Sequence, residues 1–179
     1  MSVVNLAGLT VTESSYKKAR GIVEKKSEGH RKSTDEVLNS LRSMMPGWVI
    51  ATEDEANWGA GSRNIQIDES ILERMAEDPE AMVKFKALIL DLEDAVPALE
   101  EWARENPGQT LDLSIKIDAN GTTMAEAVVR GLMGGDQRTT FQLPTEGTQS
   151  SWAELISRKL ESLSQGQVEE ADGSKSWLA

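Results

Sequence analysis

Hydrophobic and polar residues alternate most strictly between residues 111 and 118. Four aliphatic residues alternate there with four polar ones, and Asn120-Gly121 follows. A period of two places one face of a strand on a hydrophobic core and the other face in water. Asn and Gly adopt a positive φ at little cost, so the chain can reverse direction at this point. The pattern therefore predicts an antiparallel sheet with one solvent-exposed face.

The segment after this turn, residues 122–130, fits either a helix or a returning strand. A capping-box spacing at its start and the run Met-Ala-Glu-Ala favour a helix. A returning strand with a three-residue loop, in which Gly121 forms a bulge, pairs Ile115 with Ala125 and keeps apolar residues opposite one another. A two-residue turn would instead place Glu126 opposite Ile115 on the buried face. The register favours the bulged hairpin.

Other elements follow from helix caps, prolines and apolar spacing. Ser33 and Glu36 have the spacing of a capping box and begin a helix, which Pro46 and the following Gly end. The helix that begins at Pro79 has the clearest amphipathic stripe, and Pro97 is expected to kink or break it. The expected strands cover residues 48–51 and 64–68, and the expected helices cover residues 34–45, 71–77, 79–105 and 151–164.

These elements predict an α+β fold with a small antiparallel β-sheet and helices packed on one face. The sheet is expected to contain two hairpin-like units. Apart from a short interrupted helical run, the first residues lack a repeating apolar face, and the stretch before the last helix is rich in Gly, Thr and Gln without a period. The predicted organisation is a flexible basic arm (1–32), an α+β core domain (33–130), a linker (131–150), a C-terminal helix (151–164) and a loose tail (165–179).

The net charge of −11 is unevenly distributed along the chain. Residues 1–34 carry seven Lys and Arg against three Asp and Glu, whereas residues 35–179 carry twelve against twenty-seven. A basic arm therefore precedes an acidic body. The acidic body should repel phosphate backbones, which argues against binding of nucleic acid. Solubility alone also explains an acidic surface.

Residue types that the chain lacks exclude several kinds of site. The absence of cysteine excludes disulfides, thiolate metal sites and a thiol nucleophile. The chain has a single histidine, His30, which lies in the basic arm. A zinc site with several histidine ligands is therefore excluded. No apolar run approaches the roughly 18 residues of a membrane span. The first residues lack the features of a secretion signal, so we expect a cytoplasmic protein without a membrane partner.

The acidic motifs predict neither a metal nor a cofactor. Asp118-x-Asn-Gly matches the start of a calcium loop, but its twelfth position is Ala127 and not the bidentate Glu that such a site needs. Asp91 and Asp94 form the kind of carboxylate pair that acid–base chemistry uses, but they lie on a helix whose other face is apolar. A solvated polar face explains the pair.

Residues 53–61 form the one loop with a candidate partner-binding site. The loop is longer than a tight hairpin requires, and surplus loop length is often functional. Its candidate contact residues are Glu53, Asp54, Glu55 and Trp58, because the acids would steer a basic partner and the indole would supply an anchor. Alternatively, the Trp58 ring folds back over the edge of the sheet and serves stability alone.

Three runs of the sequence carry a resemblance to a known family. They are Met-Pro-Gly-Trp-Val-Ile at residues 45–50, the stretch from Asn64 to Glu80, and Ile-Lys-Ile-Asp-Ala-Asn-Gly at residues 115–121. Over residues 34–130 the chain resembles an uncharacterised bacterial family described only as a domain of unknown function. The resemblance implies a small bacterial protein without a signal, and it transfers no activity and no catalytic residue.

The sequence predicts a non-enzymatic protein-binding or accessory module whose partner is another protein. Two alternatives stay open. A carboxylate-dependent hydrolase would show a deep cleft with two or more convergent acids. An acidic mimic of nucleic acid, which blocks a basic site, would show carboxylates spaced like phosphates along one face.

Overall fold

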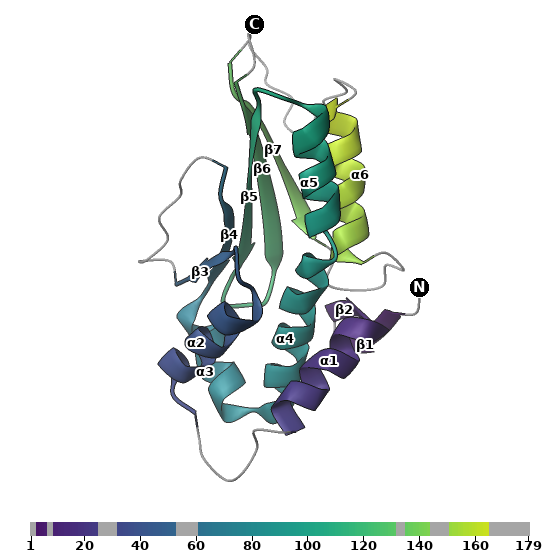
Figure 1. Cartoon of the computed structure of the whole chain (residues 1–179). Helices are drawn as coiled ribbons and strands as arrows, with labels where there is room; N and C mark the ends of the chain where they lie inside the picture. The colour runs from purple at the N-terminus through teal and green to yellow at the C-terminus, as the bar shows by residue number, and fades with distance from the viewer. Residues whose placement is uncertain are drawn as a thin grey trace, which may run out of the picture.

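A five-stranded mixed sheet with the strand order β3-β4-β5-β6-β7 forms the centre of the molecule in the computed structural model (Figure 1). The structure describes residues 3–6, 9–24, 32–52, 61–131, 135–143 and 151–164. The strands of this sheet are β3 (Val49–Ala51), β4 (Arg63–Ile67), β5 (Thr110–Ile117), β6 (Thr123–Arg130) and β7 (Gln137–Leu143).

The expected purely antiparallel sheet is wrong at one end. β3 pairs with β4 and β4 pairs with β5 in parallel, whereas β5–β6 and β6–β7 are antiparallel. Parallel neighbours need a connection that returns along the length of the strands, usually a dozen residues or more. Three helices supply it between β4 and β5. β3 and β4 are also parallel, so the length of sequence between them, residues 52–62, is explained by the need for such a connection.

The β5–β6 hairpin confirms the bulged register. Ile115 lies opposite Ala125, and residues 123–130 form a strand and not a helix. Gly121 adopts a φ of +81°, and its N–H donates to the carbonyl of Asp118 at 2.8 Å. The carboxylate of Asp118 accepts hydrogen bonds from the backbone N–H groups of Asn120 and Thr122. The residues of the calcium-like motif therefore stabilise the turn through hydrogen bonds to its backbone.

The helices begin at the caps that the sequence indicated. Ser33 and Glu36 form a complete capping box, and Asp68 and Asp78 accept N–H groups of the helices that follow them. Pro97 follows a break between two helices, as expected. The helices are α1 (Glu13–Glu24), α2 (Thr34–Met44), α3 (Glu69–Glu77), α4 (Pro79–Glu93), α5 (Val96–Glu105) and α6 (Trp152–Ser164).

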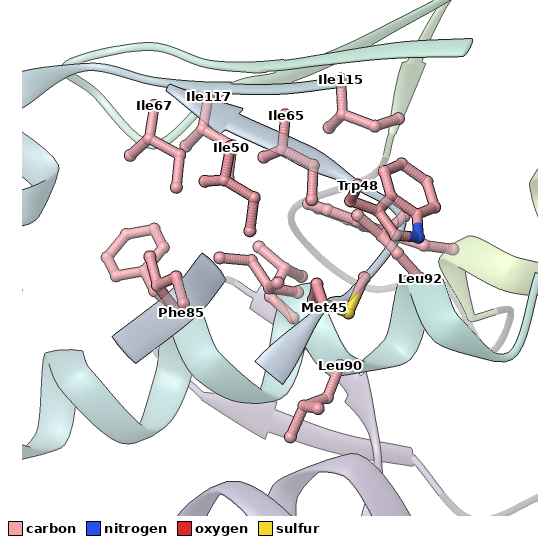
Figure 2. Packing of buried hydrophobic residues seen from close by; sticks show 14 of the residues in the cluster. Met45, Trp48, Ile50, Ile65, Ile67, Phe85, Leu90, Leu92, Ile115 and Ile117 are labelled. Atoms are coloured by element: carbon pink, nitrogen blue, oxygen red, sulfur yellow. The ribbon is translucent and has the colours of Figure 1, made fainter. Parts of the chain in front are cut away.

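Helix α4 is the central element of the core. Figure 2 shows Phe85 of α4 and Leu92 on the side of this helix that faces the isoleucines of the sheet, among them Ile65 and Ile115. Leu90 points to the opposite side, away from the sheet. Because both sides of α4 are apolar, the helix requires a cover on each.

The N-terminal residues provide the second cover, and they form regular elements within the segment expected to be a flexible arm. β1 (Val3–Leu6) and β2 (Leu9–Thr12) form an antiparallel hairpin, and α1 packs along α4 (Figure 1). Val11 and Ala19 are fully buried in the same cluster as the sheet residues. The continuous apolar run of α4 was the signal for this packing. Residues 25–31, with His30, lie outside the described part of the chain.

The expected linker also contains a strand. Residues 137–143 form β7, which adds the fifth strand to the sheet and pairs with β6 over its whole length. Helix α6 then packs against α5 and α4 (Figure 1). The tail from residue 165 lies outside the described residues. In the described part of the chain, no helix is long and apolar enough to span a membrane.

Candidate functional site

Alternate residues of the five strands point away from the helices and form a surface that we call the open face. On β5, Leu113, Ile115 and Ile117 are buried among the helices, so the polar residues between them project from the other side. The register extends this alternation across the sheet. The open face contains Val49, Ala51, Asn64, Gln66, Asp112, Ser114, Lys116, Met124, Glu126, Val128, Arg130, Arg138, Thr140 and Gln142.

A hollow of about 340 Å³ lies on the open face. Its lining residues belong to β4, β5, β6 and β7 or to Ser62, which immediately precedes β4, so none of the helices lines it. A row of side chains that the register places next to one another crosses the hollow: Asn64, Ser114, Glu126 and Thr140. Most of the groups in this row are uncharged hydrogen-bonding groups.

Two ion-paired clusters stand beside this row. The carboxylate of Asp112 accepts hydrogen bonds from the Gly61 N–H and, at 2.6 Å, from Nε of Arg130. Arg130 also donates to Asp136 at 2.8 Å. The hydrogen bond with Asp112 and the charge of this carboxylate raise the pKa of Arg130. Asp112 is only 7% exposed, and its carboxylate on β5 joins Gly61, two residues before β4, to Arg130 of β6.

The second cluster is a single pair at the outer strand. Arg138 donates to Glu126 at 2.8 Å, and both side chains are partly or largely solvent-exposed. Such exposed pairs contribute little to stability. Both carboxylates of the hollow, Asp112 and Glu126, are therefore bonded to arginines.

The side chain of Asn64 differs from its polar neighbours because one of its atoms lacks a partner. The residue is 1% exposed, and its Nδ2 donates to the Ser62 hydroxyl at 2.6 Å. Its Oδ1 is buried and accepts no hydrogen bond. Buried polar atoms in native proteins are nearly always paired, so this oxygen calls for an explanation.

The buried carboxylate of Asp91 forms a separate polar centre between helices. The expectation that Asp91 lies on a solvated face is wrong, because β2, α1 and α6 pack around it and leave it fully buried. It accepts the backbone N–H of Trp152, the first residue of α6, at 2.9 Å. Burial raises the pKa of Asp91 above its ordinary value of 3.8, and the hydrogen bonds from Thr12 and Trp152 oppose this rise. The carboxylate thus connects helices and faces no hollow on the open face.

Replacement of Asp91 by Asn should leave the protein as stable at pH 7 as the wild type, or more stable. A carboxyl group whose pKa is raised by folding contributes most to stability below its unfolded pKa, and this contribution is lost as the pH rises through the folded pKa. Asn keeps an oxygen for the Trp152 N–H and carries no charge. Melting temperatures between pH 4 and pH 8 check this, with the exposed Glu101→Gln as the control.

The Asp91→Asn comparison also has a contrary outcome. If the variant were less stable than the wild type at pH 7, and the difference shrank as the pH fell, the ionised Asp91 would stabilise the N-terminus of α6. Folding would then lower the pKa of Asp91 and not raise it.

The four loop residues singled out from the sequence, Glu53, Asp54, Glu55 and Trp58, lie outside the described residues. The described residue after this segment is Gly61, whose N–H is bonded to Asp112. Gly61 itself therefore lies next to a residue that lines the hollow. The described residues include no group of three or more His, Asp or Glu side chains that could hold a metal ion.

Sequence reasoning did not single out the hollow, although one of its signals was present. The alternation in residues 111–118 placed Asp112, Ser114 and Lys116 on the solvent side, as the structure confirms. Asn64 and Arg130 were not singled out, because their positions next to β5 depend on strand pairing across distant segments.

Comparison with known proteins gives one match. A family model described as "Protein of unknown function (DUF6033)" matches residues 51–172, which include β4 to β7 and therefore nearly all of the open face. No curated protein and no solved structure matches the chain. The family-level resemblance found in the sequence is thus confirmed, with a segment that continues through β7 and α6.

Proposed function

For a chain that belongs to the DUF6033 family of proteins of unknown function, we propose a non-enzymatic role in which the open face of the sheet binds another protein. One observation carries this proposal. The large hydrophobic side chains that are exposed among the described residues are Val49, at 48%, and Met124, at 37%, and both lie on the open face. They stand on either side of β4 and β5, whose residues on the open face are polar.

The distance between these two side chains favours a macromolecule as the ligand. Three strand spacings separate β3 from β6, which corresponds to about 14 Å. A protein surface can cover both apolar groups and the polar hollow between them at once. Apolar anchors around hydrogen-bonding groups are typical of such interfaces.

The charges of the open face favour this role over the acidic mimic of nucleic acid. Lys116, Arg130 and Arg138 stand beside Asp112 and Glu126, so the face is nearly balanced in a chain with a net charge of −11. A mimic needs a row of carboxylates without intervening cations. The balanced face instead suits a protein partner with a polar, nearly neutral surface.

The hydrolase alternative has less support. Asp112 and Glu126 do converge on the hollow, but each is bonded to an arginine. A pair that catalyses hydrolysis needs one carboxyl group that keeps its proton and an opposing carboxylate. Both acidic side chains are instead held in ion pairs, which fits a fixed binding surface.

The proposed interface extends to the loop residues Glu53, Asp54, Glu55 and Trp58. Support for this comes from Gly61, which the Asp112 carboxylate holds at the rim of the hollow. A loop that ends there is within reach of a partner seated on the open face. The acids would then add a salt-dependent contribution to the association rate.

Site-specific photo-cross-linking tests the proposal. A benzophenone amino acid is placed at Met124 on the open face or, as the matched control, at the exposed Glu101 of α5. We expect a discrete cross-linked protein from position 124 and none from position 101, with excess unmodified wild type as competitor. The double variant Val49→Lys, Met124→Glu should fail to compete. Cross-links only at position 101, or equal ones at both, would contradict binding through the open face.

A further inference from the structure

Asn64, whose side-chain oxygen is buried and unpaired, is a residue of the open face. Asn64 lines the hollow and sits opposite Ser114 in the row that crosses it. The other buried side-chain atoms without a partner in the described residues are Nε1 of three tryptophans of the hydrophobic core, Trp48, Trp102 and Trp152, and Oδ1 of Asp91, which lies between helices. Of these residues, Asn64 is the one that lines the hollow.

The chemistry around Asn64 selects the kind of group that would bind it. An amide oxygen is an acceptor only, so its partner must donate. Three cations, Lys116, Arg130 and Arg138, line the same hollow against two carboxylates, and this small excess of positive charge disfavours a cationic donor such as an ammonium group. A carboxylate or phosphate has no donor to offer. The donor is therefore uncharged, and the N–H that each residue except proline carries in its backbone is the uncharged donor that every protein offers.

We infer that Asn64 accepts a hydrogen bond from an uncharged amide N–H of the bound protein, either a peptide group or the side chain of Asn or Gln. This inference rests on the proposed function and names the contact at its centre. Because Oδ1 is covered, a neighbouring side chain must rotate before the donor reaches it.

Two small amides separate a specific hydrogen bond from general affinity. N-methylacetamide carries one uncharged N–H, whereas N,N-dimethylacetamide has nearly the same shape and none. Each is titrated into the ¹⁵N-labelled full chain and followed by amide chemical shifts. We expect saturable shifts at Asn64, Ser114 and their strand neighbours with N-methylacetamide, and at least tenfold weaker binding of N,N-dimethylacetamide. Equal shifts with both amides would overturn the inference.

The variant Asn64→Leu supplies the second measurement. Leu has a similar volume and no acceptor, so binding of N-methylacetamide should fall at least tenfold while the melting temperature stays equal or rises, because an unpaired buried polar group is removed. The matched control, Asn39→Leu, makes the same change at an exposed position of α2 away from the open face and should keep the binding. If Asn64→Leu bound the amide like the wild type, Asn64 would not be the acceptor. If it failed to fold, the comparison of the two amides on the wild type still decides.

The outcomes for this inference and for the proposed function can be told apart. Amide-specific shifts without cross-linking at Met124 would support the Asn64 contact and contradict the protein partner. Cross-linking at Met124 that persists in the Asn64→Leu variant, together with equal shifts from both amides, would support the partner and overturn the role of Asn64.

Discussion

Truncation of Leu88 to Ala is expected to lower the free energy of unfolding by about 2–5 kcal/mol. Leu88 lies on α4 and is completely buried. Because α4 is packed on the sheet side and on the α1 side, the space left by the side chain cannot be filled by movement of the helix toward solvent. The loss therefore includes both the transfer of the methyl and methylene groups and the cavity that remains.

Urea denaturation of Leu88→Ala checks this expectation, with Glu80→Ala as the control. Glu80 is exposed on the first turn of the same helix, so its replacement should change the midpoint little. A Leu88→Ala midpoint equal to that of the wild type would mean that this side of α4 does not form the core. The apolar stripe would then be a surface.

Replacement of Ala19 by Glu is expected to have the second large effect, a loss of about 3 kcal/mol or more. Ala19 is fully buried in α1, which packs on α4. A carboxylate there would lose its hydration without gaining a partner. The protein can avoid this cost by releasing α1, so we also expect faster proteolytic cleavage within residues 3–24.

Lys18→Glu provides the matched control for this experiment, because Lys18 is exposed on the same helix and the substitution introduces the same side chain. Melting temperature and limited proteolysis should match the wild type for this variant. If Ala19→Glu behaved like Lys18→Glu in both measurements, the N-terminal residues would be the flexible arm that their composition suggested.

Local patterns predicted the hairpin between β5 and β6 and the helix caps, because the physical causes lie within a few residues. The pairing of Ile115 with Ala125 follows from the loop and from the need to keep Glu126 off the buried face. The capping box at Ser33 follows from two side chains and two backbone N–H groups. Neither requires knowledge of distant segments.

The parallel strands and the hollow depend on contacts that no local pattern contains. Asn64 and Ser114 are neighbours because β4 and β5 pair across three intervening helices. The long segment between β3 and β4 fitted both a functional hairpin loop and a parallel connection, and the sequence alone does not distinguish them. A stricter interpretation of its length would have favoured the parallel pair.

The location of α1 against α4 has a consequence for the protein during its synthesis. Residues 13–24 leave the ribosome well before residues 79–93, the helix on which they dock. At translation rates of about 5–20 residues per second, this delay is on the order of 3–14 seconds. During that interval the face of α1 around Ala19 has no place to pack. The nascent chain therefore exposes the apolar side of α1 during this interval, so that this side is accessible to ribosome-associated chaperones until α4 has been made.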